Sequence, residues 1–127
     1  VLSFDLDTSK GMLLNKSVLA EIPSPDNMRL NHDYSLWVAS LLSNRIFSVD
    51  TKSGDYFVAF DAQTEKGAEN VKEGLKRVRE GDGIADLIGP ELIGKMPGLL
   101  TGMVIGSETR PFYAANLGNA LIKVSTQ

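Results

Sequence analysis

His32 is the one imidazole of the sequence, and therefore the one side chain whose ordinary pKa suits acid–base catalysis near neutral pH. Asp33 follows it, but a neighbour in sequence does not orient an imidazole as a carboxylate placed in space does. No G-x-S-x-G segment supplies a nucleophile. A single histidine also excludes multi-histidine metal sites. We assign no catalytic residue, and keep a ligand or enzyme site near His32, Asp33 and Arg110 as an alternative.

Residues 89–96 suggest a phosphate-binding loop, because they match G-x-x-x-x-G-K. Met96 stands where Ser or Thr must hold magnesium, and Pro97 and Gly98 stop any helix after the loop. Residues 81–86 likewise lack the third glycine of a dinucleotide-binding fingerprint. We therefore expect a broken helix in this region and no nucleotide cofactor.

The spacing of Asp5, Asp7 and Ser9 suits the first ligands of a calcium-binding loop. Lys10 and Lys16, however, occupy the positions that such a loop reserves for glycine and for a bidentate glutamate. We expect a hairpin turn here and no metal site, although a weaker calcium site on Asp5 and Asp7 stays open. The absence of cysteine excludes thiolate catalysis and cysteine-based metal sites.

Arg110, Phe112 and Tyr113 form a short segment of the kind found in protein interfaces, where Arg and aromatic residues are enriched. Pro111 within it favours an edge strand, because proline has no N–H group for a neighbouring strand. An edge strand is also a docking surface, so the two interpretations are compatible. We name Arg110, Phe112, Tyr113 and His32 as candidate contact residues for a protein partner.

Length and composition predict one globular domain over residues 1–127. The chain is 43% hydrophobic and 23% charged, close to globular averages, and its net charge of −3 argues against nucleic acid as a partner. No apolar run is long enough for a membrane span, and no signal peptide is visible, which favours a cytoplasmic location.

Two similar turns predict two β-hairpins. One joins strands 1–6 and 12–14 through residues 7–11, and the other joins strands 45–49 and 56–60 through residues 50–54. Both turns read Asp-Thr, a Ser/Lys pair and then Gly, which indicates one turn solution used twice. An internal duplication is an open interpretation of this five-residue match.

Two helices are expected. The first begins after Asp33 and carries an apolar stripe made of Tyr34, Trp37, Val38, Leu41 and Leu42. The second spans residues 65–80, with Thr64 as its N-cap and Gly81 at its C-terminal end. Its expected apolar stripe is Ala68, Val71, Leu75 and Val78.

The remaining residues complete an α+β fold. Residues 84–97 suggest short helical turns, and strands 99–105, 110–115 and 120–124 suggest a three-stranded meander. We expect one antiparallel sheet of about five strands, built from the N-terminal hairpin, the central hairpin and the C-terminal meander, with two main helices packed on it. From residue 33 onward this order is similar to roadblock, longin and profilin-type domains. The resemblance implies a small scaffold that pairs through helix or sheet-edge contacts.

With no convincing catalytic or cofactor motif, we expect a non-catalytic protein-interaction or assembly subunit that self-associates. A structural subunit of a larger particle, of virion or tail type, is a second hypothesis. The ligand or enzyme site named above is a third.

Overall fold

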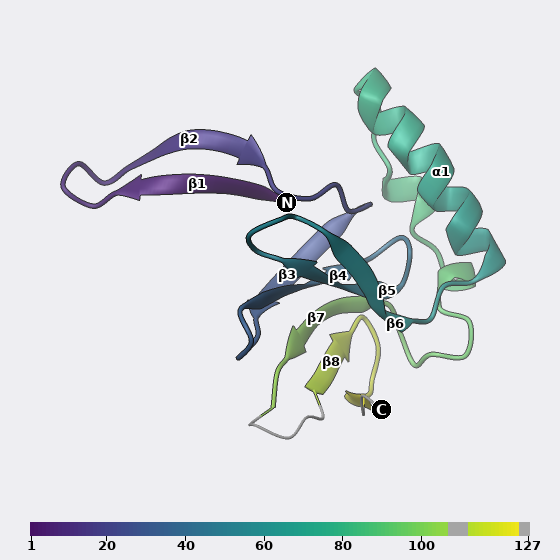
Figure 1. Ribbon diagram of the computed structural model, residues 1–127. Coiled ribbons are helices and arrows are strands. Elements are labelled where there is room, and N and C mark those ends of the chain that lie inside the picture. Colours follow the sequence, from purple (N-terminus) through teal and green to yellow (C-terminus); the bar gives the residue numbers. More distant parts are fainter. Residues whose placement is uncertain (107–111, 125–127) are drawn as a thin grey trace.

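The computed structural model describes residues 1–106 and 112–124, and for residues 112–116 it describes the backbone alone. In this part of the chain nine strands form three antiparallel sheets, each with its strands in sequence order (Figure 1). The two-stranded sheet is β1 (Leu2–Asp7) and β2 (Met12–Val18); the four-stranded sheet is β3 (Pro25–Leu30), β4 (Ser35–Ser40), β5 (Arg45–Asp50) and β6 (Tyr56–Asp61); the three-stranded sheet is β7 (Leu100–Val104), β8 (Phe112–Asn116) and β9 (Ile122–Val124). One α-helix, α1 (Glu65–Glu80), is followed by the short 3₁₀ helices η1 (Ala85–Leu87) and η2 (Pro90–Leu92).

The expected fold, one five-stranded sheet with two main helices, is wrong. The strands lie in separate sheets, and α1 is the single α-helix of the described residues. The first expected helix is instead strand β4 and the turn that follows it. The order of elements on which the resemblance to roadblock, longin and profilin-type domains rests is therefore absent.

Burial on both faces explains why β4 was mistaken for a helix. Trp37 and Ala39 pack in one hydrophobic cluster, while Val38 packs in another on the opposite face of the strand. A strand covered on both sides shows a continuous apolar run, which periodicity alone does not distinguish from a buried helix. The expected strand periodicity of two was hidden by this double burial.

Strand β3 was also missed, because its two nearby prolines predict a loop. Pro25 is the first residue of β3, at the edge of the four-stranded sheet, where a missing N–H group is tolerated. From Met28 to Leu30 the strand then pairs regularly with β4.

Both hairpins expected from the repeated turn are present, as β1–β2 and β5–β6. The C-terminal strands also form a meander in the order β7–β8–β9. The hairpin β1–β2 extends away from the rest of the molecule, on the opposite side from α1 in this view (Figure 1).

The second expected helix is confirmed with both of its caps. The Thr64 side chain accepts a hydrogen bond from the Gly67 amide, and Gly81 ends α1 in the left-handed conformation. Its expected apolar stripe is only partly right, because Leu75 and Val78 are exposed. The buried positions include Gly67 and Gly74, whose lack of side chains lets the helix approach Leu42 closely.

The four-stranded sheet is covered on both faces. One face packs against β7 and β9, in a cluster that includes Trp37, Ile46 and Leu100. The other face packs against Ala20 and Ile22, in the segment that follows β2. A third cluster, under α1, is formed by Leu42, Leu87, Leu92 and Leu99.

Candidate functional site

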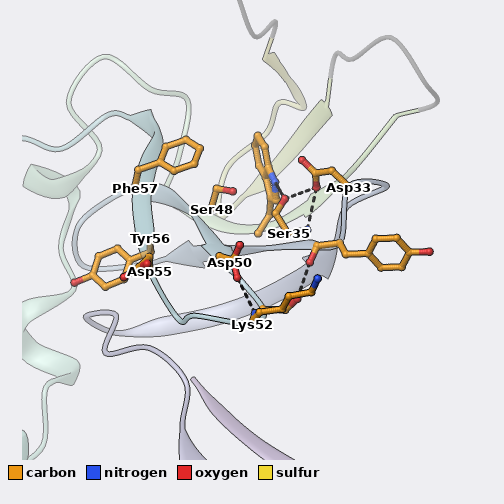
Figure 2. Close-up of a pocket in the computed structure, with 11 residues that line it drawn as sticks. Asp33, Ser35, Ser48, Asp50, Lys52, Asp55, Tyr56 and Phe57 are labelled. Carbon is orange, nitrogen blue, oxygen red and sulfur yellow. Dashed lines mark hydrogen bonds between the residues drawn. The ribbon is translucent and has the colours of Figure 1, made fainter.

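A groove of about 500 Å³ lies beside the β5–β6 turn and the turn before β4. Figure 2 shows the carboxylates of Asp33, Asp50 and Asp55 among the side chains that line it. Trp37 and Tyr56 contribute aromatic surface. These are residue types that can bind a small polar molecule. Whether the groove can do acid–base chemistry depends on the hydrogen bonds and pKa values of its carboxylates.

Asp33 and Asp50 are engaged in shaping their own turns. Asp33 Oδ1 accepts hydrogen bonds from the Ser35 amide at 2.9 Å and from the Ser35 hydroxyl at 2.6 Å. Asp50 Oδ1 accepts from the amides of Ser53 at 2.8 Å and of Lys52 at 2.7 Å, and these bonds lower the pKa of Asp50. A carboxylate with a lowered pKa is a poor proton donor near neutral pH, which argues against general acid catalysis by Asp50.

Asp5 and Asp7, the candidates for a weak calcium site, have neighbouring donors as partners. Asp5 Oδ2 accepts from Asn15 Nδ2 at 2.7 Å. Asp7 Oδ1 accepts from the Ser9 hydroxyl at 2.6 Å and from two backbone amides, and the Ser9 hydroxyl is the main cause of the lowered pKa of Asp7. Among the residues that the structure describes, no cluster of three or more His, Cys, Asp or Glu side chains is arranged to hold a metal ion.

The lowered pKa values of Asp7 and Asp50 predict a dependence of stability on pH. A carboxyl whose pKa is depressed by folding stabilises the protein above its ordinary pKa of 3.8, and this contribution is lost as the pH falls through the lower folded value. We expect the urea midpoint to fall between pH 6 and pH 3, and to fall less in a double variant, Asp7→Asn with Asp50→Asn. An equal fall in both proteins would contradict this role of the two carboxylates.

His32 lies apart from the carboxylate groove, at the contact between β3 and β7. Its Nε2 is 3.3 Å from the Gly106 carbonyl oxygen. Nearby, Asn27 Nδ2 donates to the Thr101 carbonyl oxygen at 2.6 Å. His32 and Asn27 thus join two sheets, and the side chains of His32 and Asp33 contact different parts of the molecule.

The other candidate contact residues lie partly or wholly beyond the description. Arg110 is outside the described residues, and of Phe112 and Tyr113 only the backbone is described. That backbone belongs to β8, which pairs with both β7 and β9, so the expectation of an edge strand there is wrong. A contact role for Arg110, Phe112 and Tyr113 stays a prediction.

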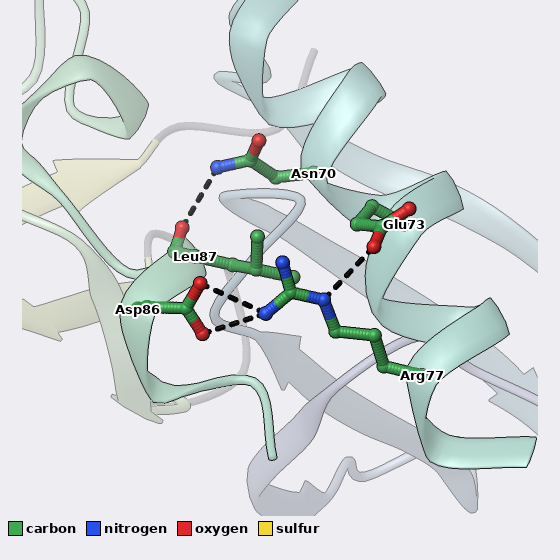
Figure 3. A network of polar contacts seen from close by, with 5 residues as sticks. All are labelled: Asn70, Glu73, Arg77, Asp86 and Leu87. Atoms are coloured by element: carbon green, nitrogen blue, oxygen red, sulfur yellow. Dashed lines mark hydrogen bonds and ion pairs between the residues drawn. The ribbon is translucent and has the colours of Figure 1, made fainter. Parts of the chain in front are cut away.

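A polar network joins α1 to η1 (Figure 3). Arg77 donates to both carboxylate oxygens of Asp86, at 2.7 and 2.8 Å, and to Glu73 at 2.9 Å, and both contacts raise the pKa of Arg77. Glu73 and Arg77 are four residues apart, so this ion pair lies along one face of α1. Asn70 donates to the Leu87 carbonyl oxygen at 2.8 Å. These contacts tie the helix to the following segment, which is a structural role.

The largest feature that the sequence reasoning missed is one face of the β1–β2 hairpin. Residues that pair directly across a hairpin share a face, so the pairs Leu2–Val18 and Leu6–Leu13 lie together. With Phe4, they form what we call the hairpin face: Leu2, Phe4, Leu6, Leu13 and Val18. Each of these five side chains is between 41% and 62% exposed. The alternation at positions 2, 4 and 6 was the available signal.

The opposite face of the hairpin is more polar. The hydroxyls of Ser3 and Ser17 are 2.7 Å apart, and Asp5 accepts from Asn15 on the same side. Met12 and Leu14 complete that face, because they pair with Asp7 and Asp5. The hairpin therefore has one more apolar and one more polar face.

No helix among the described residues has the length and apolar character that a membrane span requires. No known protein-family model matches the chain, and a search among curated proteins finds no significant match.

Proposed function

We propose that the chain is a non-catalytic assembly module that self-associates through the hairpin face. The observation that carries this proposal is the exposure of five large apolar side chains on one side of a projecting hairpin. The turn-forming roles of Asp33 and Asp50 support a non-catalytic function, since Oδ1 of each already accepts hydrogen bonds from neighbouring residues.

The physical argument begins with the instability of an isolated hairpin. Two strands alone are marginally stable in water, and an apolar face is stabilised by packing against another layer. Within the described residues, β1 and β2 make their substantial contacts with each other. A cover over the hairpin face would therefore stabilise β1–β2 as well as join two molecules.

The size of the surface suits a protein partner. Five side chains exposed at 41% to 62% present on the order of 500 Å², a large part of the roughly 800 Å² that each partner contributes to a standard interface. Contiguous exposed apolar patches of this size mark interaction sites on soluble proteins. A second copy of the chain is the occupant that we propose, because it brings an equal apolar area to the contact.

A pair of glutamate variants separates the two faces of the hairpin. Leu13→Glu places a charge on the hairpin face, and Met12→Glu places one on the opposite face at a similarly exposed position. We expect light scattering to show a molar mass that rises with concentration for the unmodified chain. Leu13→Glu should raise the dissociation constant about tenfold or more, as a loss of about 1.4 kcal/mol does, while Met12→Glu should leave it nearly unchanged.

Circular dichroism of both variants controls for loss of the fold. An unmodified chain that stays monomeric at high micromolar concentration would contradict self-association. Equal effects of Leu13→Glu and Met12→Glu would contradict the assignment of association to the hairpin face.

A further inference from the structure

The hairpins β1–β2 and β5–β6 are the same structure at a separation of 43 residues. The first strands begin at residues 2 and 45 and end at residues 7 and 50. The separation thus holds over the whole strand, well beyond the five-residue match of the turns.

The strand pairing repeats at the same separation. The pairs Leu2–Val18, Ser3–Ser17, Asp5–Leu14 and Leu6–Leu13 correspond to Arg45–Asp61, Ile46–Phe60, Ser48–Phe57 and Val49–Tyr56. Each hairpin also has one irregularity of register, which follows Ser3 in one and Ile46 in the other. Because a slip by one residue would turn every side chain to the other face, this agreement gives both hairpins the same facing pattern.

The turns are built from the same hydrogen bonds. Asp7 Oδ1 accepts from the amides two and three residues ahead, at 3.0 and 3.2 Å, and Asp50 Oδ1 does the same at 2.7 and 2.8 Å. Gly11 and Gly54 close these turns with φ values of 64° and 79°. The two hairpins are therefore equivalent in strands, register and turn.

What differs is the cover over equivalent residues. Phe4 and Leu6 are 41% and 62% exposed, whereas their equivalents Phe47 and Val49 are 5% and 0% exposed. On β5–β6 the cover comes from the adjoining strand β4, through Val38, and from the segment that follows β2. Among the described residues, β1 pairs with β2 alone, whereas β5 pairs with β4 as well as with β6.

Elsewhere in the described residues, two sheets pack face to face. The four-stranded sheet lies between the segment after β2 on one face and β7 on the other. Strands β7, β8 and β9 follow one another in the antiparallel order of β3, β4 and β5. Four antiparallel strands in a repeat of about 40–45 residues, packed face to face with the next repeat, are the features of a β-propeller blade.

We infer that β1–β2 is the outer half of a second four-stranded blade, and that its β1 edge and hairpin face bind two antiparallel strands of the β3–β4 type. This inference rests on the proposed assembly role of the hairpin face and specifies its occupant. The two strands come from a second copy of the chain, the occupant proposed above; strands from further residues of a longer polypeptide would make the same contacts and are the other outcome of the test. Backbone hydrogen bonds pair the new strand with β1, and its apolar side chains cover Phe4 and Leu6.

Extending the chain with its own strands tests the inference. A copy of residues 22–44 placed directly before Leu2 supplies the strand pair at the separation of 43 residues that the repeat requires. The matched control carries a Gly/Ser segment of equal length in the same place. The extended chain should unfold at a higher urea concentration than the control, and should bind less 8-anilinonaphthalene-1-sulfonate, a dye that reports exposed apolar surface.

A second experiment uses the unmodified chain, which needs no extension to fold, and follows the dye signal per chain as the protein concentration rises. The inference is overturned if the extended chain matches the Gly/Ser control in urea unfolding and in dye binding, and the dye signal of the unmodified chain also stays constant. A signal that falls as copies associate assigns the strands to a second copy. A constant signal, with a loss in the extended chain, contradicts a second copy as the source of the strands and assigns them to the same polypeptide. No loss in either measurement contradicts the inference, even where Leu13→Glu alters association.

Discussion

Replacing Gly54 by alanine is expected to lower the free energy of unfolding by about 3 kcal/mol, whereas Gly11→Ala is expected to cost only about 1 kcal/mol. Both glycines close equivalent turns with positive φ, a conformation that alanine adopts at a cost. An added Cβ at Gly11 would meet open space. At Gly54 it would overlap the Leu19 carbonyl oxygen, which belongs to the backbone and has little room to move.

Urea unfolding of the two variants beside the unmodified chain measures this difference. Since the turns share their hydrogen bonds, Gly11→Ala is a matched control for the backbone conformation itself. Equal losses in the two variants would show that the Gly54 turn does not pack against the segment after β2. The inferred packing of the β5–β6 hairpin against the segment that follows the β1–β2 hairpin would then be wrong.

Asn44→Ala is expected to cost about 3 kcal/mol, from lost hydrogen bonds in a buried site and from the left-handed backbone that alanine disfavours. Asn44 is 1% exposed, with φ of 49°. Its Oδ1 accepts from the Leu100 amide at 2.9 Å, and its Nδ2 donates to the Leu92 carbonyl oxygen at 3.3 Å. Asn44 therefore links the β4–β5 turn to two segments more than 45 positions further along the chain.

Asn15 supplies the control for this prediction, because it has the same residue type and a φ of 51° on an exposed hairpin. Asn15→Ala should cost about 1 kcal/mol, mainly through its backbone conformation. Calorimetric or urea unfolding of both variants gives the comparison. A loss at Asn44 no larger than that at Asn15 would mean that the buried amide bonds contribute nothing net to stability.

The features predicted correctly from sequence are those determined locally. Thr64 and Gly81 mark the ends of α1 because the capping bonds form within one turn of the helix. The Asp-to-Gly turns likewise contain their own hydrogen bonds, so residues 7–11 and 50–54 predicted two hairpins. In both cases the residues that form the hydrogen bonds lie within a few positions of each other, so a short stretch of sequence is enough to predict the structure.

The features predicted wrongly depend on distant parts of the chain. Val38 is buried by the segment after β2, and Trp37 by the C-terminal sheet, so β4 carries a continuous apolar run from Leu36 to Ala39 in place of the alternation that identifies a strand. The same limit applies to the hairpin face. Alternation shows that Leu2, Phe4 and Leu6 share a side, but the sequence does not show whether another layer covers them.

The candidate interaction residues named from the sequence are not those of the hairpin face that we propose. Arg and aromatic residues near Arg110 drew attention by their types, whereas the hairpin face consists mainly of leucine, an ordinary core residue. Its significance comes from exposure and from comparison with Phe47 and Val49, which are buried at the equivalent positions. The hypotheses of a virion or tail subunit and of a ligand site stay predictions.

Amide hydrogen exchange along β1 tests the central claim most directly. The repeat places β1 where β5 stands in the four-stranded sheet, with a neighbouring strand on each side. In the assembled or extended chain, the amides of β1 that do not pair with β2 should therefore exchange as slowly as those of β5. If these β1 amides exchange in both forms as fast as amides of an unpaired edge, no strand binds there and the account is contradicted.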